Sequence, residues 1–330
     1  MADIILDAMG GDNAPAAQVA GAVAALDKVK SDIYLSGKKE QIEKELDGFT
    51  HPRLHILHAP DVIHMAAKPV VACRKQPDSS LMVGMRFAKE KENSVFVSAG
   101  NSGAVMTAAV MVLERIPGIL RPAIAVVTPG IKHPFVLLDL GANINCSWQQ
   151  LCQFALMGSI CAELIMKKKN PKIGLLSNGS EPGKGTDAVV AANKALSETD
   201  LNFIGNVEGN DILDGVCDCI VCDGFVGNIV LKFAEGFGSA LKHSVSSGSR
   251  LKLFGKIAKR VMKKIFAKFD YSEYGATHLL GLKKSVLVTH GRANAKAIMN
   301  AIIAAEAEAD AGINKKIGTE INKYDDVLNL

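Results

Sequence analysis

The segment DIILDAMGGDNAPAAQVAGAVAALDKV, residues 3–29, sets the pattern that the rest of the chain repeats. Its apolar run from Ile4 to Leu6 predicts a buried strand. A glycine-bearing turn at 7–12 follows, and an alanine-rich amphipathic stretch from Ala16 to Val29 predicts a helix. A strand, a glycine turn and a helix in this order form the repeating unit of α/β folds.

The same alternation continues along the chain. Further strands are predicted at 33–35, 95–97, 123–127, 136–138, 173–176, 219–221 and 286–288. Helices are predicted between them at 104–113, 151–167, 187–196 and 293–311. This order predicts a three-layer α/β/α fold, in which helices cover both faces of a mostly parallel sheet.

Length and composition fit an ordinary globular protein. The chain has 330 residues, and at roughly 150 residues per domain it has room for two lobes. Neither a linker nor an internal repeat interrupts it, so we expect a single continuous α/β unit over 1–330. With 48% hydrophobic and 22% charged residues, the composition excludes disordered, collagen-like and disulfide-scaffold proteins.

Charge, cysteines and hydropathy narrow the functional classes. A net charge of +4 is too small for this length to indicate nucleic-acid binding. The seven cysteines are an odd number without a disulfide framework, and the N-terminus lacks a signal-peptide pattern. No apolar run reaches the roughly 20 residues of a spanning helix. We therefore expect a cytoplasmic protein whose membrane contact, if it has any, is peripheral.

Four polar turns that contain glycine follow predicted strands. They comprise residues 7–12, 98–103, 139–143 and 223–228. Ligands of open α/β sheets bind beyond the carboxyl ends of strands, where such loops gather. The second turn leads from a strand into a helix, so its free N–H groups and the positive helix end suit an anion such as phosphate. A plain tight turn with a helix cap is the alternative interpretation of that turn.

Other motifs fail the patterns that they resemble. The segment GSEPGKGT, residues 179–186, looks like a P-loop, but Asn178 stands in place of the first glycine. Gly185 also follows Lys184 where Ser or Thr is needed. The glycine turns match neither the G-x-G-x-x-G dinucleotide fingerprint nor the G-x-S-x-G nucleophile elbow. The sequence therefore gives no support to an NTPase, a nicotinamide enzyme or a serine hydrolase.

Two sets of candidate metal ligands are better explained by strands. Cys217, Cys219 and Cys222 alternate with apolar residues, and no second paired cluster supplies further ligands. Buried thiols are favoured there over zinc. The histidines of HPRLHILH, residues 51–58, show a similar alternation, which indicates a strand. We expect no metal site.

A basic amphipathic helix is predicted over RLKLFGKIAKRVMKKIFAKF, residues 250–269. This segment has eight basic residues and no acidic residue, and apolar residues recur in it at helical spacing. A solvated helix packed on the core is one interpretation, and contact with anionic lipid or an acidic partner is the other. The expected contact residues within a helical excursion over 237–270 are Phe254, Lys256, Ile257, Arg260, Val261, Lys264 and Ile265.

Several separated motifs together resemble those of the bacterial PlsX family of phosphate acyltransferases. They are LDAMGGDNAP at 6–15, SAGNSGA at 98–104, RP at 121–122, LDLGAN at 138–143, QFALMG at 153–158, NFIGNVEG at 202–209, DGFVGNIVLK at 223–232, and DYSEYG at 270–275 with a following LLG and HG. The resemblance spans nearly the whole chain. Ala276-Thr277-His278 departs from the family's usual Gly-Ala-Pro, and Ser177-Asn178 from its usual Asn-Ile.

The resemblance implies an isocitrate/isopropylmalate dehydrogenase-like fold, related also to phosphotransacetylases. It implies an enzyme that converts long-chain acyl-acyl-carrier protein and inorganic phosphate into acyl phosphate and free acyl-carrier protein, for phospholipid synthesis. It further implies a homodimer in peripheral contact with anionic membrane, whose product feeds a membrane glycerol-3-phosphate acyltransferase.

The residues are compatible with this reaction. Phosphate is a nucleophile and a thiolate is a good leaving group, so no covalent nucleophile, metal or organic cofactor is required. The protein must hold two anions together and stabilise an oxyanion. The expected catalytic residues are Lys184, Asn101, Asp223 and Asn228. Lys184 is expected to be the main source of electrostatic stabilisation. The expected phosphate- and substrate-binding residues are Asp7, Gly10, Gly11, Asp12, Ser98, Gly100, Ser102, Gly103 and Asn143.

Two alternatives stay open on the sequence alone. One is a phosphotransacetylase-like enzyme that uses acyl-coenzyme A, and competition between the two kinds of thioester distinguishes it. The other is a non-enzymatic scaffold that its basic helix tethers to a membrane or to an acidic protein. Failure to release carrier-protein thiol in phosphate favours the scaffold.

Overall fold

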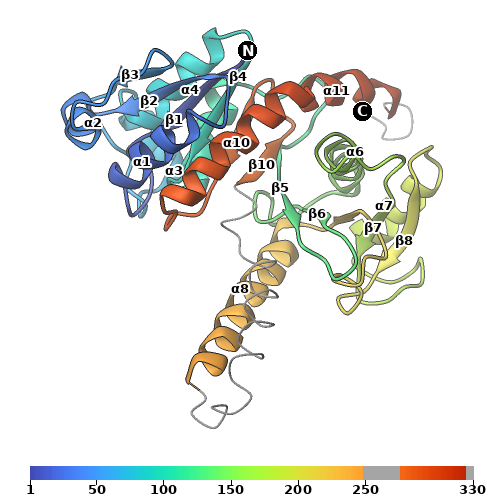
Figure 1. Ribbon diagram of the computed structural model, residues 1–330. Helices are drawn as coiled ribbons and strands as arrows, with labels where there is room; N and C mark the ends of the chain where they lie inside the picture. The colour runs from blue at the N-terminus through green and yellow to red at the C-terminus, as the bar shows by residue number, and fades with distance from the viewer. Residues whose placement is uncertain (248–275, 325–330) are drawn as a thin grey trace.

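The computed structural model describes residues 1–247 and 276–324, with side chains over 1–240 and 276–324. Within these residues, eleven strands form one sheet in the order β3-β2-β1-β4-β11-β10-β5-β6-β9-β7-β8. Figure 1 shows the two ends of this sheet in two lobes. The strands are β1 (Asp3–Asp7), β2 (Asp32–Gly37), β3 (Leu54–His58), β4 (Ser94–Ser98), β5 (Ala123–Thr128), β6 (Phe135–Leu138), β7 (Ile173–Leu176), β8 (Phe203–Val207), β9 (Cys219–Val221), β10 (Thr277–Leu280) and β11 (Ser285–Val288).

Most neighbouring strands are parallel, but the sheet changes direction at its middle. β10 is antiparallel to both β11 and β5, and β5 is antiparallel to β6. As a result, β1 to β4 and β11 point one way, and β6 to β9 point the other way. The carboxyl ends of β1 to β4 and β11 therefore lie at one edge of the sheet, where strands end, and the carboxyl ends of β6 to β9 lie at the opposite edge.

Side chains of the central strands alternate between cores on the two faces of the sheet. In β1, Ile4 and Leu6 belong to one core and Ile5 to another. In β6, Val136 belongs to a third core and Phe135 to a fourth. Successive residues of a strand point to opposite faces, so a strand that is apolar throughout must be covered on both sides. The fold is therefore the predicted three-layer α/β/α arrangement with a mostly parallel sheet.

Helices supply the two outer layers. They are α1 (Ala16–Ala25), α2 (Lys39–Leu46), α3 (Pro69–Lys75), α4 (Ser80–Glu90), α5 (Ser102–Val112), α6 (Trp148–Ile165), α7 (Asp187–Ser197), α8 (Gly224–Ser247), α10 (Ala295–Ala311) and α11 (Ile313–Glu320). α1 and α10 cover one face of the first lobe, and α3, α4 and α5 cover the other. α6, α7 and α11 cover one face of the second lobe. In Figure 1, α10 crosses from the first lobe towards α6, which it contacts.

α8 begins at the carboxyl end of β9 and projects away from both lobes (Figure 1). Near its start, Val230 and Leu231 pack against the fourth core. Farther along, Phe233 is 71% exposed and Phe237 is 56% exposed, and their rings stack with centroids 6.0 Å apart. The outer part of α8 therefore leaves apolar surface uncovered by the described residues.

The predicted helical excursion over 237–270 overlaps the end of α8. Residues 237–247 are helical, whereas 248–270 lie outside the described residues, as do the membrane-contact residues predicted at 254–265. Among the described helices, none has the length and apolar character needed to cross a membrane.

Every strand and helix predicted within the described residues is present, with ends shifted by a few residues, whereas the helix predicted over 250–269 lies outside them. β8, β10 and several helices were not predicted from the sequence. β8 reads FIGNV, and its Gly205, at φ +95°, sits beside the register shift between β7 and β8. Gly and Asn are poor strand formers, so this strand depends on its neighbour for its conformation.

Candidate active site

A buried carboxylate, Asp7, organises the turns after β1 and β4. Its Oδ1 accepts a hydrogen bond of 2.6 Å from the Ser80 hydroxyl, and its Oδ2 accepts one of 2.8 Å from the Ser98 hydroxyl. Ser98 Oγ in turn accepts the N–H of Gly100 at 3.0 Å. We call Asp7, Gly10, Ser80, Ser98 and Gly100 the Asp7 cluster.

Burial has the largest effect on the pKa of the Asp7 carboxyl. The residue is 3% exposed, and burial raises the pKa of its carboxyl although hydrogen bonds from Ser80, Ser98 and the backbone oppose that rise. A carboxylate enclosed in this way is placed to hold the two turns together, because its oxygens face hydroxyl and amide donors of the protein. We therefore assign Asp7 to positioning the site.

Two glycines allow the turns to close over this carboxylate. A Cβ at Gly10 would lie 2.5 Å from Asp7 Oδ2 and 2.9 Å from both Gly100 N and Ser98 Oγ. Gly11 has φ +104°, a left-handed conformation that favours glycine. The glycines that the sequence analysis selected are thus required by close packing at one position and by backbone conformation at the next.

Asn101 caps α5 and clamps a neighbouring segment. Its Oδ1 accepts the N–H of Ala104 at 3.0 Å, and its Nδ2 donates to the carbonyl oxygens of Met65 and Ala67 at 2.7 and 3.1 Å. Because its amide is occupied in this way, its role in this geometry is to position the loop. The next two residues are exposed, and within 1–247 and 276–324 no acceptor bonds their backbone N–H groups. Those N–H groups point to anion binding at the start of α5.

A loop after β11 completes this site, and the sequence analysis did not include it. The N–H of Asp12 donates to the Gly291 carbonyl oxygen at 2.7 Å. Asn13 Nδ2 donates to the carbonyl oxygens of Arg292 and Ala293 at 3.3 and 3.1 Å. The HG dipeptide at 290–291 was the only sequence signal for this loop, because its contacts are made through the backbone.

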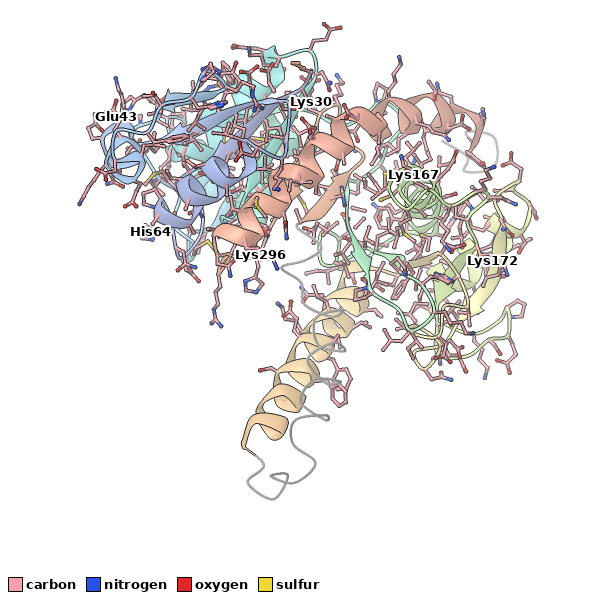
Figure 2. The ribbon with its side chains drawn as sticks, in the orientation of Figure 1. Lys30, Glu43, His64, Lys167, Lys172 and Lys296 are labelled. Carbon is pink, nitrogen blue, oxygen red and sulfur yellow. The ribbon has the colours of Figure 1, made fainter. Side chains whose placement is uncertain are left out.

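Basic side chains surround these loops. His64, before α3, and Lys296, in α10, lie at the lower rim of the first lobe in Figure 2. Lys68 and Arg292 are exposed on the segments that adjoin Asn101 and Asp12. Positive charge around a set of free N–H groups favours an anionic ligand.

A second buried carboxylate, Asp139, organises the turn after β6. Its Oδ1 accepts the N–H groups of Ile124 and Ala142 at 2.9 and 3.1 Å. Its Oδ2 accepts both the backbone N–H and the side-chain Nδ2 of Asn143, at 2.7 and 3.0 Å. Asp139 is fully buried, and burial raises the pKa of its carboxyl despite these bonds. Asp139 is not among the site residues predicted from the sequence, although the turn begins there.

The predicted site residues of this second region also make bonds within the protein. Asn143 Nδ2 donates to the Pro122 carbonyl oxygen at 2.8 Å as well as to Asp139. Asp223 Oδ1 accepts the N–H of Val226 at 2.8 Å and so caps α8. Asn228 is exposed. Asn143 and Asp223 therefore hold the turn and the helix. The Asn228 amide lies against the same turn, because a Cβ at Gly141 would be 2.8 Å from its Nδ2.

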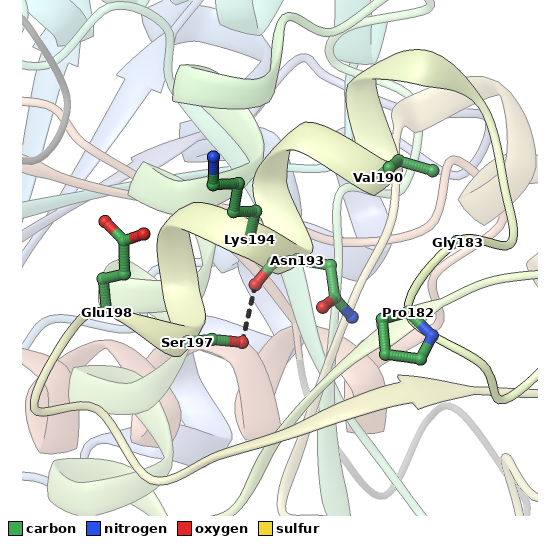
Figure 3. A pocket seen from close by; sticks show the side chains of 7 residues that line it. All are labelled: Pro182, Gly183, Val190, Asn193, Lys194, Ser197 and Glu198. Atoms are coloured by element: carbon green, nitrogen blue, oxygen red, sulfur yellow. Dashed lines mark hydrogen bonds between the residues drawn. The ribbon is translucent and has the colours of Figure 1, made fainter.

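Lys184 lies in the exposed loop between β7 and α7. Asn206 Nδ2 holds that loop by donating to the carbonyl oxygens of Glu181 and Lys184 at 2.8 and 3.3 Å. Asn193 Nδ2 donates to Asn206 Oδ1 at 3.0 Å. Figure 3 shows a shallow groove between this loop and α7, lined by Pro182, Gly183, Val190, Asn193, Lys194, Ser197 and Glu198.

The four turns do not share one edge of the sheet, which corrects the expectation drawn from the sequence. The turns after β1 and β4 lie at one edge with the loop after β11, whereas Asn143, Asp223 and Lys184 follow strands that end at the other. No hydrogen bond or ion pair among the described residues joins the two regions.

The seven cysteines are free thiols, and six of them are buried. Cys217, Cys219 and Cys222 are buried, and burial raises the pKa of each thiol. His55 pairs with Asp32 at 3.0 Å on β3, the strand that the alternation predicted. Over the described residues, no group of three or more His, Cys, Asp or Glu side chains is arranged to hold a metal ion.

Comparison with solved structures shows which known folds this one resembles. A phosphotransacetylase from Streptococcus pyogenes superposes with a TM-score of 0.61 at 17% identity, over 93% of this chain and 94% of that one. A branched-chain phosphotransacylase from Enterococcus faecalis superposes with a TM-score of 0.57 at 14% identity, over 94% and 99% of the two chains. At these identities the likeness shows a shared fold.

Comparison of sequences shows the family. The model of a family described as "Fatty acid synthesis protein" matches residues 2–316. The phosphate acyltransferase of Dictyoglomus turgidum is 44% identical over 331 aligned residues, covering 98% of each chain. That of Geotalea uraniireducens is 41% identical over 326 aligned residues, covering 97% of this chain and 94% of the relative. The chain is thus an acyltransferase that belongs to the PlsX family of phosphate acyltransferases.

Proposed function

We propose that this enzyme transfers a long-chain acyl group from acyl-acyl-carrier protein to inorganic phosphate, forming acyl phosphate for phospholipid synthesis. The observation that carries the proposal is the pair of glycine turns held by Asp7 beneath the exposed start of α5. Such an arrangement suits an anion, and the relatives that align along nearly the whole chain are named phosphate acyltransferases. Phosphate is accordingly the anion that we assign to it.

The reaction needs the two substrates to be positioned and the developing charge to be stabilised, and it needs no covalent nucleophile from the protein. A phosphate oxygen attacks the thioester carbonyl carbon, the new C–O bond forms, and the C–S bond breaks with both electrons on sulfur. The thiolate of the carrier then takes up a proton as the free thiol. The N–H groups of Ser102 and Gly103 hold the phosphate. Lys184 follows a strand that ends at the other edge of the sheet, and we assign its positive charge to the carbonyl oxyanion of the acyl donor.

Several finer features belong to the same proposal. The chain forms one continuous unit of the isocitrate/isopropylmalate dehydrogenase type and works as a cytoplasmic homodimer. Acyl-carrier protein is the acidic partner. Residues 250–269 make peripheral contact with anionic membrane, so that the reactive amphiphilic product is released near the enzyme that uses it. These statements rest on the family resemblance and on the sequence of that basic segment.

The first prediction is that thiol release depends on phosphate. Purified enzyme with acyl-acyl-carrier protein should release carrier thiol in phosphate buffer, and hydroxylamine should trap the acyl phosphate as a hydroxamate. Equal thiol release without phosphate would identify a thioesterase and refute the proposal. Absence of thiol release in both buffers would favour the scaffold.

The phosphotransacetylase-like alternative has one observation in its favour, which is the shared fold. Supplying acyl-coenzyme A and acyl-acyl-carrier protein together separates the two proposals. Preferential turnover of the coenzyme A thioester would assign the substrate class to that alternative.

The second prediction concerns Lys184. The Lys184→Ala variant should lose about tenfold in kcat/KM, equivalent to about 1.4 kcal/mol, because it removes a positive charge offered to phosphate or to the oxyanion. Lys194→Ala is the matched control, since Lys194 is exposed on the adjacent α7 but lies outside the loop. Steady-state kinetics that show equal losses, or no loss, for the two variants would remove Lys184 from the site.

A further inference from the structure

Ser80 stands at the base of the candidate site and belongs to none of the motifs that point to function. It is the first residue of α4 and is 1% exposed. Its Oγ donates to Asp7 Oδ1 at 2.6 Å, while Asp7 Oδ2 accepts from Ser98, which is fully buried. One chain of hydrogen bonds thus runs from α4 through Asp7 and Ser98 to the N–H of Gly100.

We propose that Ser80 is a positioning residue of this enzyme, which acts through Asp7 and Ser98 to hold the glycine turns in the conformation that binds phosphate. The inference rests on the proposed function and extends it to a residue on an element that contributes nothing else to the site.

The order of donors and acceptors in this chain explains why the hydroxyl matters. A serine hydroxyl has one proton, so the bond to Asp7 Oδ2 turns the Ser98 lone pairs towards Gly100. The same rule directs the Ser80 proton to Asp7 Oδ1. Without Ser80, that oxygen loses its shortest hydrogen bond and keeps the Met9 N–H at 3.3 Å, which is a long bond for a desolvated carboxylate.

Movement of Asp7 would pass directly to both turns. A Cβ at Gly100 would lie 3.4 Å from Asp7 Oδ2 and 3.6 Å from the Gly10 Cα, so carboxylate and backbone are in contact without an intervening side chain. Gly100 leads into Asn101, Ser102 and Gly103, whose backbone begins α5. A small rotation of the carboxylate therefore changes where the free N–H groups point.

The backbone of Ser80 is fixed independently of its hydroxyl. Its N–H donates to the Asp61 carbonyl oxygen at 2.9 Å, and its own carbonyl oxygen accepts the Ser36 hydroxyl at 2.8 Å. Ser80→Ala should therefore keep the start of α4 in place and remove only the donor to Asp7.

The experiment compares Ser80→Ala with Ser94→Ala. Ser94 is 4% exposed, its hydroxyl donates to the Ala88 carbonyl oxygen at 2.6 Å, and it lies at the opposite end of β4 from Ser98. Both variants lose one buried hydroxyl bond, so their thermal stabilities should fall by similar amounts. Ser80→Ala should raise the KM for phosphate about tenfold and leave the KM for the acyl donor unchanged, while Ser94→Ala should change neither by more than about twofold.

A double-mutant cycle of Ser80→Ala with Ser98→Ala tests the chain of hydrogen bonds itself. If both serines act through Asp7, the double variant should raise the KM for phosphate about as much as the larger single effect. If the two substitutions raise the KM for phosphate independently, so that their effects multiply, the serines do not act through one chain of hydrogen bonds. Equal KM values for Ser80→Ala and Ser94→Ala would overturn the role of Ser80.

Binding of inorganic phosphate, measured as thermal stabilisation of the intact protein, separates this inference from the proposed function. Weaker stabilisation of Ser80→Ala than of Ser94→Ala supports the positioning role even if the wild type fails to transfer acyl groups. A wild type that phosphate does not stabilise overturns the positioning role directly.

Discussion

Gly227→Ala is expected to destabilise the protein by about 3 kcal/mol or more, because the new methyl group would collide with backbone. A Cβ at position 227 would lie 1.9 Å from the Asp139 carbonyl oxygen and 3.0 Å from Cys222 Sγ. Backbone hydrogen bonds hold that neighbour, since the Asp139 N–H donates to the Cys222 carbonyl oxygen at 3.0 Å. Removing this clash requires α8 to move away from β6, and that movement would disrupt the packing of the first turns of α8.

Gly236→Ala is the matched control for this prediction. It lies in the same helix, and a Cβ there would meet no atom of the described residues within 4 Å. Alanine should stabilise the helix at that position by about 0.5–1 kcal/mol. Thermal and urea denaturation of the two variants should therefore shift in opposite directions. If Gly227→Ala melts like the wild type, α8 does not pack against the Asp139 carbonyl oxygen.

The layers of the fold were predictable from the sequence because buried strands and amphipathic helices leave a local signal. Runs such as 95–97 and 173–176 are apolar and end at turns, and both are strands in the structure. The reversal of direction at β10 had no such signal. It depends on which strands become neighbours, and β10 pairs with β5, more than 140 residues earlier in the chain. The expectation of one common edge failed for this reason.

The candidate site was predictable in part for a similar reason. Glycines in turns are visible because few other residues adopt their conformations, as at Gly11. The hydrogen-bond partners of a side chain, in contrast, leave no signal in the sequence. Ser80 lies 73 positions from the carboxylate that it bonds, and nothing in its local sequence distinguishes it from a helix cap. Likewise, the amide of Asn143 looks free in the sequence and is occupied in the structure.

Gly10→Ala should lower kcat/KM by about 100-fold, or about 2.7 kcal/mol, the larger of the expected effects on activity. The new methyl group would lie 2.5 Å from Asp7 Oδ2 and 2.9 Å from Ser98 Oγ and Gly100 N. None of these neighbours is the free end of a flexible side chain, because Asp7 and Ser98 are bonded to each other and Gly100 N is backbone. The methyl group must therefore separate the two turns or break the Asp7–Ser98 bond, and either change displaces the N–H groups at the start of α5.

Two further measurements show whether this loss arises at the site. Circular dichroism and thermal denaturation should show a folded Gly10→Ala protein, since the turn lies at the edge of the sheet and the cores beneath it are unchanged. Phosphate should no longer stabilise that variant, whereas Gly236→Ala should bind phosphate like the wild type because its methyl group meets no described residue within 4 Å. Normal phosphate stabilisation of Gly10→Ala would show that the turns tolerate separation, and the phosphate site would then have to lie elsewhere than between Asp7 and α5.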